Sequence, residues 1–178
     1  MKENDNQFFY QSCQTPVGWL RAISDSAHLI QLDWNQIGWT DADRPDDVSR
    51  ETIAQLTAYF AGQLTTFAIP LRPAGVSPER QHWLHVMASI DFGTTISYTE
   101  FAAAAGAPKA ARAAGTACAT NPIPIIYPCH RVVRRNGKLG HYGGGSQLST
   151  SHNDNVARKA FLIAHEKNQL DNGRLFLT

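Results

Sequence analysis

The sequence predicts an α/β (α+β) protein in two parts: a small N-terminal domain with a β-sheet and a helix over residues 1–73, and a mainly helical C-terminal domain over residues 74–178. Three observations indicate this organisation. Strand-like segments and one helix-like segment come first, a proline-rich connection follows, and apolar residues at helical spacing come after it. A chain of 178 residues is long enough to bury a real core, in one domain or in two small ones.

The N-terminal part has the pattern of a small sheet with one helix. Residues 19–24 and 29–34 are predicted strands, and residues 49–60 are predicted to form an amphipathic helix. After these elements comes the stretch Pro70-Leu-Arg-Pro-Ala-Gly-Val-Ser-Pro78, which has the punctuation of a linker. We therefore place the domain boundary in this stretch.

Apolar residues follow the linker at helical spacing. They are Trp83, Val86, Met87 and Ile90. This spacing indicates packing in a core and requires no cofactor.

Residues 98–118 are predicted to form a helix-turn-helix. Tyr98 to Ala105 can form a short helix closed by Gly106, and Pro108 can occupy the first turn of a second helix that runs to about Cys118. The second helix carries little bulk, since its small residues are Ala110, Ala111, Ala113, Ala114, Gly115 and Ala117. On composition alone, such a surface favours packing against another helix.

Charge is divided unevenly between the two parts. Residues 1–73 hold five Lys/Arg against nine Asp/Glu, a net −4, whereas residues 74–178 hold eleven against six, a net +5. Basic residues close in sequence to the predicted site are what a phosphate-binding surface requires. A solvated rim explains them equally well. They are Lys109, Arg112, Arg131, Arg134, Arg135, Lys138, Arg158 and Lys159.

Neither a leader nor a membrane partner is expected. The stretch Met1-Lys-Glu-Asn-Asp5 lacks an apolar signal region, and no segment approaches the length of a bilayer span. The three cysteines, Cys13, Cys118 and Cys129, show no repeated short spacing, which argues against a disulfide framework or a cysteine-rich zinc site. We therefore expect a cytoplasmic protein with no metal and no cofactor.

Cys129 is the candidate nucleophile. Pro122, Pro124 and Pro128 restrict the backbone that leads to it, and a held nucleophile benefits from that stiffness. A free thiol has a pKa of about 8.5, so a base must take its proton at neutral pH. His130 is the nearest candidate, through a turn or a bridging water, and Glu166 is the candidate carboxylate that orients the imidazole. The alternative is that Cys129 is a buried packing residue.

Several ordered motifs over residues 90–166 resemble the O6-alkylguanine-DNA alkyltransferases. The central motif is Pro128-Cys-His-Arg-Val-Val133, with Asn121-Pro122 before it and Gly140-His-Tyr-Gly-Gly144 after it. The flanking motifs are Ile96-Ser-Tyr98, Pro108-Lys-Ala-Ala-Arg-Ala-Ala-Gly115 and Phe161-Leu-Ile-Ala-His-Glu166. Before about residue 75 the resemblance is faint and depends on Thr15-Pro-Val-Gly18.

The resemblance implies a single-turnover DNA repair protein. Members of this family transfer the alkyl group of O6-alkylguanine, and on this expectation also of O4-alkylthymine, to their own cysteine, here Cys129. The base is flipped out of double-stranded DNA, because its target atom is inaccessible inside the helix. The thioether product is not reversed by thiol exchange. The resemblance also implies a winged-helix or helix-turn-helix-like C-terminal domain, a monomer, and no cofactor.

The same resemblance assigns roles to residues around Cys129. Arg112 would fill the space left by the flipped nucleotide, and Tyr98 would contact that nucleotide and donate a proton toward the leaving guanine. Asn121 would be the hinge between the recognition helix and the active-site segment. The remaining DNA contacts are predicted to be Lys109, Ala110, Ala111, Ala113, Gly115, Arg131 and Arg134. The base pocket is predicted to include Cys118, Val132, Tyr142, Gly143 and Gly144.

Two loops complete the prediction. Asn136-Gly137 is a tight-turn signal that would fold its loop back toward the cysteine. Residues 146–155 are polar and turn-rich, so they are predicted to be a mobile surface loop.

Two other functions stay open. A relative without a reactive thiol would bind alkylated bases and recruit other repair factors. A cysteine hydrolase would usually draw its histidine from a distant segment.

Overall fold

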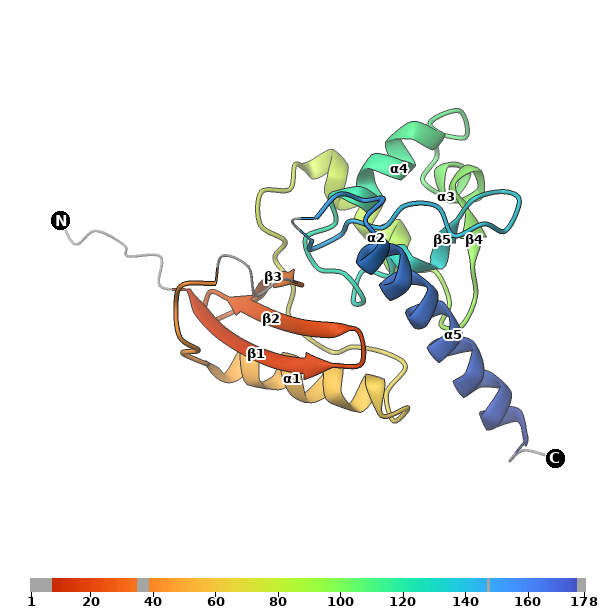
Figure 1. Ribbon diagram of the computed structural model, residues 1–178. Helices are drawn as coiled ribbons and strands as arrows, with labels where there is room; N and C mark the ends of the chain where they lie inside the picture. The colour runs from red at the N-terminus through yellow and green to blue at the C-terminus, as the bar shows by residue number, and fades with distance from the viewer. Residues whose placement is uncertain (1–7, 35–38, 147, 176–178) are drawn as a thin grey trace. The chain divides into compact units, whose positions relative to one another are not determined.

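The structure is a computed structural model that describes residues 8–34, 39–146 and 148–175. Met1–Asp5, where no leader was expected, and Gln147 in the second predicted loop lie outside the described residues. The chain forms two compact units, the first ending at Ala74 and the second beginning at Gly75. Together they make a mixed α/β protein with a sheet in the first unit and mostly helices in the second (Figure 1).

The first unit is built on a three-stranded antiparallel sheet in the order β1-β2-β3. Its strands are β1 Phe9–Thr15, β2 Gly18–Ser24 and β3 Leu29–Asp33. The β1–β2 pair ends at Thr15 opposite Gly18, where Gly18 has φ +110° and its carbonyl accepts a hydrogen bond from the Thr15 hydroxyl at 2.7 Å. The sequence predicted β2 and β3 and missed β1.

A single helix packs against this sheet. Helix α1, Asp47–Phe60, begins with a capping box in which Asp46 and Ser49 satisfy each other's backbone N–H. Its apolar stripe, Ile53, Leu56 and Tyr59, is buried. Figure 1 shows α1 running along the sheet. The predicted helix over residues 49–60 is confirmed, starting two residues earlier.

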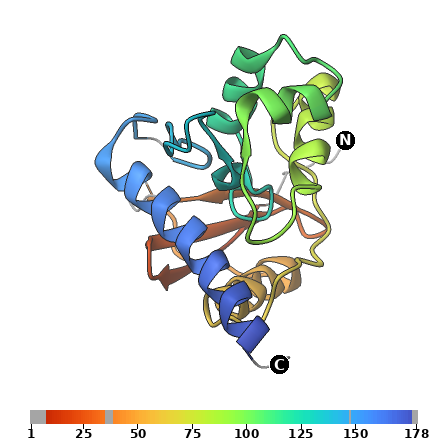
Figure 2. The same ribbon diagram turned by 90° about the vertical axis from the view of Figure 1, so that its right-hand side faces the viewer.

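The second unit contains helices and one short pair of strands. In chain order its elements are α2 Pro78–Ala88, β4 Ile96–Ser97, α3 Tyr98–Ala104, α4 Ala111–Ala119, the 3₁₀ turn η1 Cys129–Arg131, β5 Val132–Val133 and α5 Asn153–Leu175. Trp83 and Met87 of α2 are buried, and so is Ile90 just after the helix, as the apolar spacing predicted. Figure 2 shows α5 as one long helix.

Helices α3 and α4 form the predicted helix-turn-helix. A capping box between Ser97 and Glu100 starts α3, and Gly106, at φ +77°, follows its end. The prediction that Pro108 lies in the first turn of the second helix was wrong. The Ala110 N–H bonds the Ala107 carbonyl at 2.8 Å, so residues 107–110 make a separate turn and α4 begins at Ala111.

The β4–β5 pair positions the site. These strands are parallel, with Ile96 opposite Val132 and Ser97 opposite Val133. Tyr98 directly follows β4, and Cys129 opens the turn that leads into β5. Two segments more than thirty residues apart in the sequence are therefore held side by side.

Outside these elements, one loop prediction is confirmed and the other is partly wrong. Gly137 has φ +76° and its N–H bonds the Arg134 carbonyl at 2.9 Å, so the predicted turn is present. Asn153 to Asn155 belong to α5 and not to a surface loop, and Asn155 is fully buried, with its side chain donating to the Ser149 carbonyl at 3.0 Å. No described helix is both long enough and apolar enough to cross a membrane.

Candidate active site

The segment that leads to Cys129 is fixed by Asn121. Its Oδ1 accepts a hydrogen bond from Ile123 N at 3.0 Å, which closes an Asx turn, and its Nδ2 donates to the Tyr127 carbonyl at 2.7 Å. Ile125 is buried at φ +73°, a left-handed conformation that is unusual for a β-branched residue. The backbone before the cysteine is therefore held by side-chain bonds and packing as well as by its prolines.

The Cys129 sulfur is enclosed, with only 1% of the residue exposed. It accepts a hydrogen bond from Asn121 Nδ2 at 3.2 Å. Burial raises the pKa of the Cys129 thiol, while the bond from Asn121, the positive charge of Lys159 and the hydroxyl of Tyr142 oppose that shift. Because the net shift is upward, the thiol rests in its protonated form and needs a base to react.

His130 and Glu166 form a buried hydrogen-bonded pair. His130 Nε2 lies 2.7 Å from Glu166 Oε1, and both residues are almost fully enclosed. Burial lowers the pKa of His130, so the imidazole is neutral at neutral pH. Burial alone would raise the pKa of Glu166, but the contacts with His130 and Arg131 hold it well below its ordinary value. Because Glu166 is anionic, Nε2 carries the proton, and Nδ1 has no hydrogen-bond partner among the described residues. Nδ1 is thus able to accept a proton.

Arg131 corrects a sequence prediction. It was expected at the DNA surface, but it is buried and its guanidinium is occupied. Nε and Nη2 contact the Glu166 carboxylate at 2.9 and 3.0 Å, and Nη1 donates to the Ile90 carbonyl at 2.5 Å. A bidentate, buried pair of this kind commits the guanidinium to Glu166 and leaves little of it exposed. Arg131 therefore holds Glu166, and its buried guanidinium does not form part of the exposed surface on which it was predicted.

Tyr98 lies at the start of α3 with its hydroxyl near α5. Its Oη is 3.4 Å from Lys159 Nζ. Burial raises the pKa of the phenol, and nearby Cys118 and Cys129 add to that effect. The hydroxyl therefore keeps its proton at neutral pH and can donate it.

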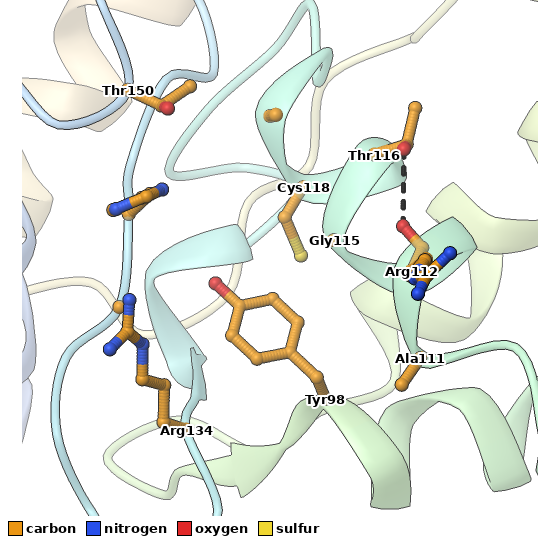
Figure 3. A pocket seen from close by; sticks show the side chains of 11 residues that line it. Tyr98, Ala111, Arg112, Gly115, Thr116, Cys118, Arg134 and Thr150 are labelled. Atoms are coloured by element: carbon orange, nitrogen blue, oxygen red, sulfur yellow. Dashed lines mark hydrogen bonds between the residues drawn. The ribbon is translucent and has the colours of Figure 1, made fainter.

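A cavity of about 640 Å³ opens beside Tyr98 and α4. Figure 3 shows the Cys118 sulfur and the Tyr98 ring facing the same space, with Arg112 on α4 and Arg134 across from it. Helix α4 projects little side-chain bulk at three of its lining positions, because Ala111, Gly115 and Ala119 are small. The remaining lining residues are Thr116, Gly140, His141 and Thr150. Cys129 is not one of the lining residues, and its sulfur is enclosed by protein.

The predicted base-pocket residues divide into two groups. Cys118 lines the cavity. Val132, Tyr142, Gly143 and Gly144 are buried away from the lining. A Cβ on Gly144 would lie 3.1 Å from Cys129 Sγ and 3.2 Å from Asn121, so this segment covers the sulfur closely because it has no side chain there.

The basic and small residues predicted to contact DNA also divide by exposure. Arg112 and Ala113 on α4 are exposed, as are Lys109 and Arg134, while Ala110, Ala111 and Gly115 are half-buried. Arg158 and Lys159, which the sequence placed on the same basic surface, are buried within α5. Sequence reasoning therefore missed Lys159 as part of the site. A lysine seven residues before Glu166 on a helix, two turns away, was the available signal.

No group of three or more histidine, cysteine or acidic side chains in the described part of the chain could hold a metal ion. Cys13, Cys118 and Cys129 are all free thiols.

Comparison with known proteins covers both units. The model of the ribonuclease-like domain of 6-O-methylguanine DNA methyltransferase matches residues 8–73. The model of the DNA-binding domain of the same enzyme matches residues 78–168. Each unit of the fold thus matches its own part of one family.

Relatives match along most of the chain. The methylated-DNA–protein-cysteine methyltransferase of Mycobacterium leprae is 37% identical over 90% of this chain and 93% of its own length. That of Mycolicibacterium paratuberculosis is 40% identical over 89% and 92%. A crystal structure of Mycobacterium tuberculosis OGT in complex with DNA has a TM-score of 0.76 at 35% identity, covering 90% of this chain and 93% of that one. The chain therefore belongs to the 6-O-methylguanine DNA methyltransferase family.

Proposed function

We propose that Cys129 is the residue that accepts the alkyl group. Relatives that share nine-tenths of this chain are methylated-DNA–protein-cysteine methyltransferases, and this chain is one as well: a DNA repair protein that moves an alkyl group from DNA to its own cysteine. The observation that carries the assignment to Cys129 is the buried His130–Glu166 pair, in which His130 directly follows this cysteine and its Nε2 lies 2.7 Å from Glu166 Oε1. Neither Cys13 nor Cys118 has such a pair beside it.

The first step is deprotonation of the thiol. The proton leaves Cys129 Sγ and passes through a water molecule to His130 Nδ1, the one ring nitrogen that Glu166 does not occupy. The imidazolium that forms is stabilised by the anionic Glu166. Asn121 Nδ2, 3.2 Å from the sulfur, stabilises the thiolate through its hydrogen bond.

The second step is displacement at the alkyl carbon of O6-alkylguanine. A bond forms between Sγ and the carbon while the bond between that carbon and O6 breaks, and the electron pair goes to the guanine ring. Tyr98, which lines the cavity and holds its proton, donates it to the departing base. O4-alkylthymine offers the same alkyl–oxygen bond. Because the product is a thioether, each molecule reacts once.

Double-stranded DNA would meet the protein at α4. This helix exposes Arg112 and small residues beside the cavity, so it can approach the minor groove closely. The alkylated nucleotide is flipped into the cavity, and Arg112 fills the gap left in the stack. Lys109 and Arg134 are exposed nearby and would contact phosphates. Since Cys129 is 1% exposed, the cavity wall must shift for the alkyl carbon to reach the sulfur.

One chain supplies the acceptor, the relay and the helix that would face DNA, so we propose that the protein acts as a monomer. Its three free cysteines fit a reducing compartment such as the cytoplasm.

The test is transfer of label from DNA that carries radiolabelled methylguanine. We expect one label per protein molecule, located on the Cys129 peptide by mass spectrometry. Cys129→Ala removes the transfer, and the matched variants Cys118→Ala and Cys13→Ala keep it. The second candidate function, recognition of alkylated bases without reaction, predicts tight binding of methylated DNA with no label on wild-type protein.

A further inference from the structure

Thr150 lies between the cavity and the backbone that covers the Cys129 sulfur. Its side chain lines the cavity, and Figure 3 shows it across the pocket from Arg112 on α4. The cover is defined as Gly143 and Gly144, and a Cβ on Gly144 would lie 3.1 Å from Cys129 Sγ. A base in the cavity has to bring its alkyl carbon to that sulfur, so the side chain that joins the cavity to the cover affects which alkyl groups fit.

The methyl group of Thr150 occupies the space that a side chain on Gly143 would fill. A Cβ built on Gly143 would lie 2.4 Å from Thr150 Cγ2 and 3.4 Å from Thr150 Cβ. It would also lie 3.3 Å from the carbonyl oxygen of Ala119, near the end of α4. The Thr150 methyl group therefore packs directly on the Gly143 backbone, and the cover has no free space on this side.

Hydrogen bonds fix the backbone at Thr150. The Thr150 carbonyl accepts a hydrogen bond from Tyr142 N at 2.9 Å. One residue earlier, the Ser149 carbonyl accepts a hydrogen bond from Asn155 Nδ2 at 3.0 Å. Asn155 is fully buried, and its Oδ1 accepts a hydrogen bond from Arg158 Nη1 at 2.8 Å. A side chain on a backbone held at these points is a fixed part of the cavity wall, so it can discriminate between substrates by size.

We propose that Thr150 is a specificity-determining residue and that its methyl group limits the size of the alkyl group that reaches Cys129. This inference rests on the proposed function. A methyl group on O6 needs little room beside the cover, whereas a benzyl group is larger and meets the Thr150 methyl group. Thr150→Ala removes that methyl group and leaves space next to Gly143 that continues the cavity.

The test compares two transfer rates to Cys129 in the full chain, one from O6-methylguanine and one from O6-benzylguanine in the same duplex. In Thr150→Ala we expect the ratio of the benzyl rate to the methyl rate to rise roughly tenfold, the discrimination that one methyl group in a pocket provides. Thr150→Val keeps the branched shape without the hydroxyl, so its ratio stays at the wild-type value. Ser151→Ala, a change at the exposed next residue, is the control and also leaves the ratio unchanged.

Cys118 reports the size of the same cavity without alkyl transfer from DNA. Its sulfur faces the cavity (Figure 3). The full chain is treated at alkaline pH with iodoacetamide or with N-benzyl iodoacetamide, and the Cys118 peptide is followed by mass spectrometry. The S–C bond forms as the C–I bond breaks, iodide leaves, and the thiol proton goes to buffer. Thr150→Ala should favour the benzyl reagent relative to wild type, and Thr150→Val should not.

Three results overturn the inference. They are an unchanged benzyl-to-methyl ratio in Thr150→Ala, equal changes of that ratio in Thr150→Ala and Thr150→Val, and equal losses of both rates with a lower Tm in Thr150→Ala. Wild-type protein that takes no label from methylated DNA refutes the proposed function, and the Cys118 ratios then still test Thr150 as part of the wall. Wild-type protein that takes label, with neither ratio changed in Thr150→Ala, refutes the Thr150 inference alone.

Discussion

Two buried cations of the second unit have partners of different kinds, a carboxylate for Arg131 and neutral oxygens for Lys159. Arg131 belongs to the Glu166 cluster, defined as His130, Arg131 and Glu166, in which one carboxylate serves both basic side chains at 2.7 to 3.0 Å. Lys159 belongs to the Lys159 cluster, defined as Lys159, Tyr98 and the His141 carbonyl, in which every partner is neutral. The first cluster contains a carboxylate, whereas among residues 8–34, 39–146 and 148–175 no carboxylate forms an ion pair with Lys159.

The difference indicates what each cluster does. A closed set of paired charges orients His130 and keeps its Nδ1 available, but its own charges change little until a proton arrives. The positive charge of Lys159 opposes the effect of burial on the Cys129 thiol, whose pKa is nevertheless raised overall. In the proposed reaction the Glu166 cluster therefore receives the proton.

The largest loss of stability is expected when the Glu166 cluster loses its carboxylate, so that, as in the Lys159 cluster, a buried cation has only neutral partners. Glu166→Gln removes the carboxylate and leaves Arg131 buried without its anion. We expect a loss of about 3–5 kcal/mol in the free energy of unfolding, measured by urea denaturation at pH 7. Glu79→Gln, an exposed change on α2, is the control and should stay within about 0.5 kcal/mol.

Acidification should affect the stability of wild-type protein and of Glu166→Gln differently. The pKa of Glu166 in the fold is depressed below its ordinary value of 4.5, so its contribution to stability is present above that pH and lost as pH falls. Wild-type stability should therefore drop more steeply on acidification than that of Glu166→Gln. Parallel acid curves would show that the carboxylate charge does not hold the cluster.

The sequence was sufficient to predict the reactive residues, but it did not predict which charged side chains are buried. Cys129 and His130 are adjacent, and Glu166 was the carboxylate chosen for the imidazole, so this part needed little tertiary information. Arg131 and Lys159 were both placed on a basic surface. Residue type does not report burial, and the partner of Arg131 lies 35 residues away.

The same limit explains the errors in the fold. Strand β1 was missed because its residues Gln11, Ser12 and Gln14 are polar, and only pairing with β2 makes this segment a strand. The N-terminal end of α5 was taken for a loop because Asn153 to Asn155 are polar, yet Asn155 is buried through bonds to the preceding turn. In both places contacts with a neighbouring segment override local preference.

Arg112 is an exposed cation outside both clusters. Its loss should slow only the repair of double-stranded DNA. In Arg112→Ala the gap left by a flipped nucleotide stays open, and flipping costs a few kcal/mol, so we expect duplex repair to slow by roughly 10- to 100-fold. Reaction with free benzylguanine should be unchanged, because no stack has to be opened. Both rates are measured as alkyl transfer to Cys129.

The control for Arg112 is a cation that lies outside the cavity. Arg135 is exposed and does not line it, so Arg135→Ala should weaken duplex repair only through the loss of one charge, an effect that disappears at high salt. The Arg112→Ala defect should persist in salt. Equal losses with duplex DNA and free benzylguanine would refute the stack-filling role.

The smallest expected effect comes from Gly144, which lies against the Cys129 sulfur. A Cβ at this position would approach Cys129 Sγ to 3.1 Å and the Asn121 carbonyl to 3.2 Å. Because Asn121 and Cys129 are both buried, Gly144→Ala should cost about 1–3 kcal/mol in unfolding free energy through overpacking.

Gly115→Ala is the matched control: its Cβ meets open space within a helix, where alanine is preferred, so its stability should be equal or higher. If both variants unfold alike, the enclosure of the sulfur does not depend on the missing side chain. If only Gly144→Ala is destabilised, and the titration of Cys129 shifts with it, the sulfur holds its place relative to both clusters because a glycine backbone covers it.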